Sequence, residues 1–165
     1  MPEAAIDTAP ILCSSADGIA RITLNRPSAG NSLSFELMQA LRNTLTELRE
    51  DKSVKVIILE GSGGRIFCAG HDLRELSGET NVDALAADFE ILGGLMQDIM
   101  SQPQIVIAKV EGVATAAGCE LVAACDLALA SADARFAVPG VNIGFWCYSP
   151  QIQLSRAVGR KQAMM

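Results

Sequence analysis

Two short apolar runs, KVIILEG (residues 55–61) and IVIAKV (residues 105–110), limit most strongly how this chain can fold. Both are compact and rich in β-branched residues, which is typical of strands buried on both faces of a sheet. Residues 18–25 and 127–131 predict two further strands. Because helical segments lie between these strands, the pattern predicts an α/β architecture.

Apolar periodicity identifies the helices. Ser34 is a typical N-cap residue, and the leucines that follow recur on one face of an amphipathic helix: Leu37, Leu41, Leu45 and Leu48. Residues 83–101 suit a second helix, and a short helix is expected around Glu120. No repeat or linker divides the chain, so we expect a single domain over residues 1–165.

The end of the chain carries no helix stop signal. Residues 156–165 look like the first turns of another amphipathic helix, and no stop follows them. A fragment, a gene product truncated at its C-terminus and a last helix that frays all remain open.

The composition excludes several classes of protein. The formal net charge is −6, and the only basic cluster is Arg156, Arg160 and Lys161, so no nucleic-acid partner is expected. No apolar run approaches the roughly 20 residues that span a bilayer. The N-terminal ten residues lack the features of a secretory signal. We therefore expect no membrane span and a cytoplasmic location.

The five cysteines are odd in number and lack CxxC spacing. This pattern argues against a disulfide framework and against a zinc site. We interpret the thiols as reduced and mostly as core residues.

Residues 112–131, GVATAAGCELVAACDLALAS, are almost wholly apolar but carry Glu120 near their centre. A carboxylate is costly to bury without partners. Either Glu120 reaches the surface or the interior of the protein uses its charge.

Two segments, IFCAGHDL (residues 66–73) and VATAAGCEL (residues 113–121), are the most informative about chemistry. Each places small residues where a predicted strand gives way to a loop or a helix, so that backbone N–H groups can approach a ligand. Two such groups that converge on one oxygen form an oxyanion hole. The GSGGR stretch lacks the spacing of a phosphate-binding loop, and no GxSxG nucleophile elbow occurs.

Four stretches occur together over nearly the whole chain: LNRPSAGNSLS, VIILEGSGGRIFCAGHDLREL, KVEGVATAAGCELVAACDLALAS and ARFAVPGVNIG. In order and spacing they resemble the enoyl-CoA hydratase/isomerase (crotonase) superfamily. The resemblance implies a crotonase-like spiral of ββα turns that binds an acyl-CoA or enoyl-CoA thioester. It also implies a homotrimer or a hexamer and no metal or redox cofactor, with coenzyme A present only as part of the substrate. The C-terminal helical part of that fold is missing from this sequence.

Matching positions assign roles to particular residues. The resemblance implies that the thioester oxygen accepts hydrogen bonds from the main-chain N–H groups of His71 and Ala117, which stabilise an enolate-like anion. It implies that Glu120 acts as an acid or base. The CoA moiety is expected to contact mostly backbone atoms, with Arg74 available to a phosphate, along Ser28, Ala29, Gly30, Ala69, Asp72, Leu73, Arg74, Pro139 and Gly140.

The sequence departs from the family pattern at two places. Hydratases of the family usually have three glycines before the Cys-Glu pair, where this chain has Ala116, Ala117 and Gly118. The added methyl groups tighten the pocket and disfavour positive φ. The second departure is Gly140, which stands where the family's second catalytic glutamate is expected.

Several roles have alternatives at this stage. The His71 side chain is either an acid or base near neutral pH or a packing residue beside the oxyanion hole. Asp72 is also compatible with a turn or a helix cap. Glu120 is either catalytic or a buried structural carboxylate.

The function that these observations favour is hydration of a 2-enoyl-CoA by a lyase, or isomerisation, through a stabilised thioester enolate. The alternative is a non-catalytic acyl-CoA-binding protein, because Gly140 replaces the second glutamate.

Overall fold

The computed structural model describes residues 9–77 and 80–164. It contains a five-stranded sheet in the order β1 (Ile11–Ala16), β2 (Ile19–Leu24), β3 (Val56–Gly61), β5 (Ile105–Val110) and β7 (Leu127–Ala130). A second sheet has the order β4 (Ile66–Cys68), β6 (Val113–Thr115) and β8 (Arg135–Ala137). Strand β1 is antiparallel to β2, and all other neighbouring pairs are parallel.

The chain visits the two sheets alternately. Strands β3, β5 and β7 of the larger sheet are followed by β4, β6 and β8 of the smaller one. The helices that follow these pairs are α2 (Leu73–Ser77) with α3 (Val82–Met100), then α4 (Ala117–Ala124), and then α5 (Tyr148–Ala157). This repetition is the ββα spiral that the sequence predicts.

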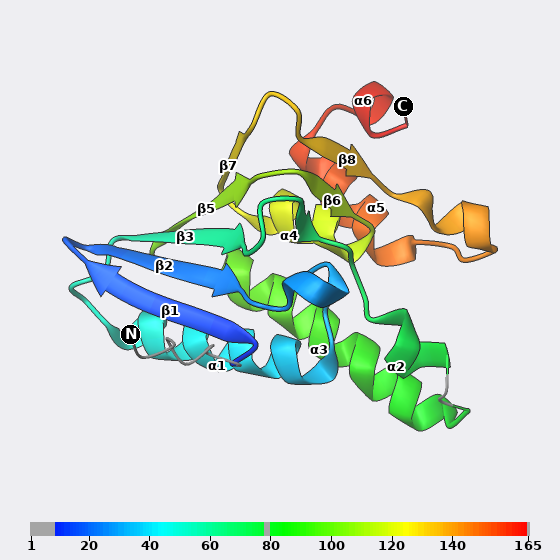
Figure 1. Ribbon diagram of the computed structural model, residues 1–165, viewed down its shortest axis with the longest axis horizontal. Coiled ribbons are helices and arrows are strands. Elements are labelled where there is room, and N and C mark those ends of the chain that lie inside the picture. The colour runs from blue at the N-terminus through cyan, green and yellow to red at the C-terminus, as the bar shows by residue number, and fades with distance from the viewer. Residues whose placement is uncertain (1–8, 78–79, 165) are drawn as a thin grey trace, which may run out of the picture.

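The remaining elements lie at the two ends of the spiral (Figure 1). Helix α1 (Phe35–Glu50) follows the short helix η1 (Pro27–Ala29) and packs with α3 below the larger sheet. Helix η2 (Pro139–Ile143) precedes α5, and α6 (Arg160–Ala163) lies on the far side of the molecule from α1.

The main core lies between the larger sheet and helices α1 and α3. Helix α1 begins where predicted, because the Ser34 hydroxyl accepts a hydrogen bond from the Leu37 N–H at 3.2 Å. One face of the helix is buried, through Leu37, Met38, Leu41, Leu45 and Leu48. These side chains pack in one apolar cluster with Ile22, Ile57 and Val106 from the sheet.

The predicted strands and the helix over 83–101 are confirmed to within a residue or two. The predicted burial of β3 and β5 on both faces is wrong, because alternate residues of each strand are only partly buried or are exposed. The helix expected over residues 156–165 is also wrong: α5 ends at Ala157, and a separate short helix begins at Arg160. Cys68 and Cys119 are buried as expected, whereas Cys13 is exposed.

Candidate functional site

The two small-residue segments meet because β4 and β6 are adjacent parallel strands, whose carboxyl ends lie at one edge of the sheet. The Thr115 hydroxyl donates a hydrogen bond to the Ala69 carbonyl at 2.8 Å. Gly70 has φ +90°, and a Cβ at this position would lie 3.0 Å from the Thr115 carbonyl and 3.1 Å from the Ala117 nitrogen. Only glycine allows both this conformation and this approach.

Ala116 adopts a conformation that L-residues rarely occupy, with φ +50° and ψ −124°. Three hydrogen bonds hold it: its N–H donates to the Ala137 carbonyl, and its own carbonyl accepts from Cys119 and Glu120. The sequence prediction that the alanines here disfavour positive φ therefore identifies a real strain, which the structure accepts at Ala116.

The N–H groups of the two loops are divided between structural hydrogen bonds and free donors. In the first loop, Ala69 donates to the Gly30 carbonyl, Gly70 to the Cys68 sulfur and Asp72 to the Leu33 carbonyl. Within the described residues, the His71 N–H between them has no acceptor.

The same division occurs in the second loop. The first turn of α4 leaves the Ala117 and Gly118 N–H groups without an acceptor in the described part of the chain. The N-terminal end of the helix carries a partial positive charge that favours an anion. The donors at His71 and Ala117 are thus available to an external oxygen.

Both donors belong to residues that line one cavity of about 240 Å³. Its wall is largely apolar and comes from the two loops, from α2 and α3, and from residues 139–150. Of the predicted site residues, the lining includes Ala69, His71, Leu73, Ala117, Pro139 and Gly140. It also includes polar side chains of Thr115, Asn142, Tyr148 and Ser149.

Glu120 lies behind this wall. Its residue is only 3 % exposed, and it is not one of the residues that line the cavity. The Ser149 hydroxyl, which does line the cavity, donates to Glu120 Oε2 at 2.7 Å. Burial raises the pKa of Glu120 above its ordinary value, and the hydrogen bond from Ser149 acts in the opposite direction. Glu120 is therefore buried, as one of the two predicted alternatives requires. Its carboxylate is linked to the cavity through the Ser149 hydroxyl.

The His71 imidazole is hydrogen-bonded to the Asp88 carboxylate of α3. It also makes an edge-to-face contact with Phe89, whose ring lies 5.1 Å away between centroids. Phe89 is in turn 6.1 Å from the Tyr148 ring. The His71 side chain thus packs against its neighbours and pairs with Asp88, which fits a packing residue beside the two donors. It also lies at the cavity wall.

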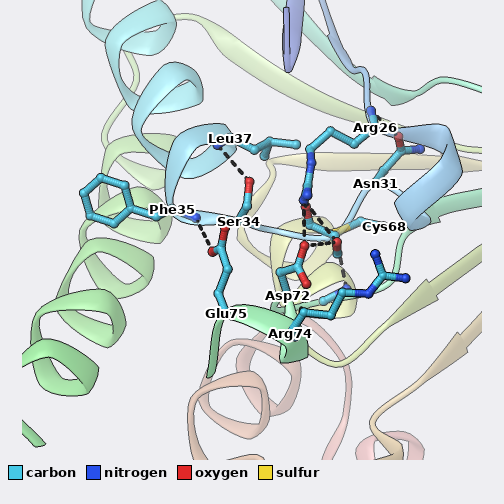
Figure 2. Close-up of polar contacts among 11 residues, drawn as sticks. Arg26, Asn31, Ser34, Phe35, Leu37, Cys68, Asp72, Arg74 and Glu75 are labelled. Carbon is cyan, nitrogen blue, oxygen red and sulfur yellow. Dashed lines mark hydrogen bonds and ion pairs between the residues drawn. The ribbon is translucent and has the colours of Figure 1, made fainter. Parts of the chain in front are cut away.

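Asp72 anchors the first loop from the interior side (Figure 2). Its carboxylate accepts hydrogen bonds from Ser32 at 3.0 Å and from the Arg74 N–H at 3.2 Å, and it pairs with Arg26 at 3.0 Å. Burial by itself would raise the pKa of Asp72, but the hydrogen bonds from Arg26, Ser32 and Arg74 outweigh it and hold the pKa below its ordinary value. The predicted cap role is confirmed, whereas the side chain does not line the cavity.

Asn31 joins the turn after β2 to Ser62 and to Ile66 at the start of β4, the strand that precedes this loop. Its side chain accepts from the Arg26 N–H and donates to the carbonyls of Ser62 and Ile66. Figure 2 shows the Arg26 side chain reaching from the segment after β2 to Asp72, while the Asn31 side chain lies beside the Arg26 backbone. The network therefore fixes the position of the His71 backbone from two sides.

The other residues predicted to contact CoA lie beside the cavity. Ser28 is exposed, Ala29 is half-buried and Gly30 is buried, and none of them lines it. Gly30 is close to Ala69, because a Cβ on Gly30 would lie 3.3 Å from the Ala69 Cβ. Arg74 is exposed on α2. The two predicted CoA-contacting stretches are thus neighbours in space.

Gly140 is buried at the start of η2, against the loop that precedes α5. A Cβ here would overlap the Cys147 sulfur and would lie 2.8 Å from the Phe145 carbonyl oxygen. A glutamate cannot occupy this position without movement of that loop.

The sequence did not reveal Ser149, Tyr148 or Asp88 as parts of the site. Asp88 lies within a correctly predicted helix, but helical periodicity does not reveal that it faces His71 from another element. The segment that carries Ser149 had no assigned structure at all. Only the packing of α5 on α4 brings Ser149 to Glu120.

Two features that would indicate another class of protein, a metal-binding cluster and a membrane-spanning helix, are absent from the described residues. In residues 9–77 and 80–164, no group of three or more His, Cys, Asp or Glu side chains is arranged to hold a metal ion. No helix in the same described ranges is long and apolar enough to cross a membrane.

Comparison with known sequences gives a consistent family. The sequence model described as enoyl-CoA hydratase/isomerase matches residues 14–165. The chain is 44% identical over 147 residues to the Xenopus laevis enoyl-CoA hydratase domain-containing protein 3, mitochondrial, covering 89% of this chain and 50% of that protein. It is 37% identical over 144 residues to a probable enoyl-CoA hydratase of Mycobacterium tuberculosis, covering 87% of this chain and 54% of that protein.

Solved structures agree with this assignment. An enoyl-CoA hydratase from Mycobacterium smegmatis superimposes with a TM-score of 0.90 at 46% identity, covering 94% of this chain and 60% of that chain. Human enoyl-CoA hydratase domain-containing protein 3 superimposes with a TM-score of 0.89 at 42% identity, covering 94% of this chain and 61% of that chain. The chain thus spans about half the length of the curated relatives it matches. The name of the Xenopus protein places it in mitochondria, whereas the sequence predicts a cytoplasmic location for this chain.

Proposed function

Because the chain belongs to the enoyl-CoA hydratase/isomerase family, we propose that it binds an acyl-CoA or enoyl-CoA thioester in the cavity between its two small-residue loops. The thioester oxygen accepts hydrogen bonds from the His71 and Ala117 N–H groups. The observation that carries this proposal is a pair of backbone donors, without acceptors among the described residues, on the wall of one largely apolar cavity.

In this proposal the acyl part of the thioester occupies the apolar cavity, and the CoA part leaves it along Ala69 and Leu73. Both residues are exposed and line the cavity, and the stretch Ser28–Gly30 lies beside them. The exposed Arg74 is then available to a phosphate. Coenzyme A is part of the substrate in this proposal, which needs no metal or redox group.

The proposed reaction is hydration of a 2-enoyl-CoA. Addition of water to the β-carbon creates negative charge on the thioester oxygen, where the two N–H groups and the N-terminus of α4 stabilise it. Glu120 is the buried carboxylate nearest the cavity through its hydrogen bond to Ser149, and its raised pKa suits exchange of a proton.

A panel of 2-enoyl-CoAs of increasing chain length, with hydration measured for wild type and Glu120→Gln, tests this function. We expect turnover by the wild type and a loss of about 10²- to 10⁴-fold in kcat for the variant. Wild-type turnover that Glu120→Gln leaves intact would contradict the role of Glu120. No wild-type turnover on any member of the panel would contradict the reaction.

A second candidate is a non-catalytic acyl-CoA-binding protein. The observation that favours it is the tight packing around Gly140, which leaves no space for a second carboxylate. This candidate predicts that unreactive butyryl-CoA binds while crotonyl-CoA is not hydrated. Calorimetry with butyryl-CoA beside the hydration assay therefore separates the two candidates.

The assembly that we propose is a homotrimer or a hexamer. Large apolar side chains are exposed on β7 and β8, among them Leu127, Leu129 and Phe136. Exposed apolar surface of this kind is typical of contacts between subunits. Native mass spectrometry is expected to give three or six copies, and a monomer at micromolar concentration would contradict the proposal.

A further inference from the structure

The Ser149 hydroxyl lies between Glu120 and the space that a substrate would fill. Ser149 lines the cavity, whereas Glu120 does not. The hydroxyl donates to Glu120 Oε2 at 2.7 Å, which is a charge-assisted hydrogen bond of normal length. Ser149 thus links Glu120 to the cavity by a hydrogen bond along which a proton can pass.

No other side chain of the described lining combines a hydroxyl with a carboxylate behind it. The Thr115 hydroxyl is engaged by the Ala69 carbonyl, and the Tyr148 ring contacts Phe89. His71 is paired with Asp88. Ser149 and Glu120 come from α5 and α4, which pack closely against each other, so the pair is held by the fold.

A second carboxylate at the position of Gly140 is excluded by packing. Addition of water across a double bond nevertheless needs a group that accepts a proton and one that returns it. A hydroxyl linked to a carboxylate can do both in turn, because the oxygen of the hydroxyl accepts one proton as its own proton passes to the carboxylate.

We infer that Ser149 is the catalytic residue that contacts the substrate, and that Ser149 and Glu120 form a two-member proton relay that replaces the family's pair of glutamates. This inference rests on the proposed function, since it requires a thioester in the cavity.

The reaction that follows is balanced without a further reactant. Water attacks the β-carbon and forms a C–O bond, its proton passes to Ser149 Oγ, and the Ser149 proton passes to Glu120. The π electrons move to the thioester oxygen, which the His71 and Ala117 N–H groups hold as an enolate. The proton then returns from Glu120 through Ser149 to the α-carbon. One water molecule has been added, and the serine and the carboxylate are restored.

Kinetics of crotonyl-CoA hydration test the relay. We expect Ser149→Ala to lower kcat by about 10²-fold or more while the affinity for butyryl-CoA stays unchanged. Ser149→Thr keeps the hydroxyl and is expected to keep most of the activity. The matched control is Ser155→Ala, an exposed serine of α5 outside this cavity, which is expected to leave kcat unchanged. Should Ser149→Ala not fold, Ser149→Val, which is nearly isosteric with Ser149→Thr and lacks the hydroxyl, carries the same test.

The double variant Ser149→Ala with Glu120→Gln gives the sharper result. Members of one relay act as a unit, so the double variant is expected to be no slower than the slower single variant. Losses that multiply would overturn the inference, because they would show two independent routes. Full activity in Ser149→Ala beside an inactive Glu120→Gln would overturn it as well, since Glu120 would then act on the substrate directly.

Proton exchange separates this inference from the proposed reaction. In D₂O, the relay is expected to exchange the α-hydrogens of bound butyryl-CoA, and mass spectrometry is expected to show that Ser149→Ala abolishes the exchange. Exchange without hydration of crotonyl-CoA would refute hydration and support the relay. Binding with neither exchange nor hydration would refute both and would leave the non-catalytic binder.

Discussion

Glu120 shows how one residue of this protein departs from ordinary folding rules. A carboxylate in an apolar segment is unfavourable unless it has partners, and here a serine from another helix donates a hydrogen bond to it. Burial raises its pKa, so protonation is easier in the folded state than in the unfolded chain. A buried carboxylate with a raised pKa beside a cavity is typical of a group that transfers protons.

Replacement of Glu120 by glutamine is expected to stabilise the fold at neutral pH. Because the pKa of Glu120 is raised on folding, its contribution to stability is fully present below the pKa of the unfolded chain. That contribution is lost as the pH rises through the raised folded pKa. Thermal unfolding of Glu120→Gln and wild type should therefore differ at pH 7 and converge towards pH 4. A variant that is less stable than the wild type at pH 7 would show that the carboxylate is structural.

Activity is expected to depend on pH through the same carboxylate. Glu120 must be ionised to accept a proton, so kcat should fall as the pH drops through its raised pKa. The acidic limb of the pH profile should consequently lie above the range of an ordinary glutamate. An acidic limb in the pH range of an ordinary glutamate would contradict the burial of Glu120 in the active protein.

Ala116 is the second residue that departs from ordinary folding rules, because its backbone conformation is strained. Ala116→Gly relieves its positive φ and is expected to stabilise the protein by about 1 kcal/mol. The matched control is Ala123→Gly in the same helix α4, which lacks this strain and should destabilise the protein by about 1 kcal/mol. Chemical denaturation measures both, and a destabilising Ala116→Gly would contradict the strain.

At the scale of elements, the site depends on loops that are fixed by buried polar networks. The first loop is held by the buried Asp72 side chain and by backbone hydrogen bonds from Ala69 to Gly30 and from Asp72 to Leu33. The second is held by the hydrogen bonds of Ala116 with β8 and with the first turn of α4. Because both loops are anchored through groups other than the His71 and Ala117 N–H, the two donors are preorganised for an oxygen.

Asp72→Asn tests this anchoring. It leaves Arg26 without its charged partner, and we expect a loss of about 2 kcal/mol in the free energy of unfolding at pH 7. The pKa of Asp72 is lowered on folding, so the stability it supplies is present above the unfolded pKa and is lost as the pH falls through the folded one. The difference between variant and wild type should therefore shrink in acid.

Glu75→Gln, at an exposed carboxylate of the neighbouring helix α2, serves as the control and is expected to change stability by less than about 1 kcal/mol. Equal effects of the two variants would show that the Asp72 network has no special role.

The sequence predicted the elements with strong local signals. The cap at Ser34 and the leucine period located α1, and β-branched runs located β3 and β5. Strands β4, β6 and β8 have three residues each, too few for a period to be visible, and no bounds were predicted for them. The two donor positions followed from the resemblance, but Ser149 and Asp88 reach the site only through tertiary packing, for which one sequence carries no signal.

At the scale of the whole molecule, the spiral explains why the site lies where it does. Each turn of the spiral places one strand in each sheet. The ends of β4 and β6 are therefore neighbours in space, although Cys68 and Val113 lie 45 residues apart in the sequence. The cavity forms where these ends meet α3 and the segment before α5. Solved relatives of which this chain covers about three fifths share this arrangement with high structural similarity.

The most direct test of the account is the vibrational frequency of the thioester carbonyl in the bound state. Isotope-edited difference infrared spectra of butyryl-CoA labelled with ¹³C at the carbonyl measure it without any turnover. Two hydrogen bonds from the His71 and Ala117 N–H groups polarise the carbonyl, so we predict a shift to lower wavenumber on binding. A bound carbonyl at the frequency of free butyryl-CoA in water, or at a higher one, would contradict the oxyanion hole.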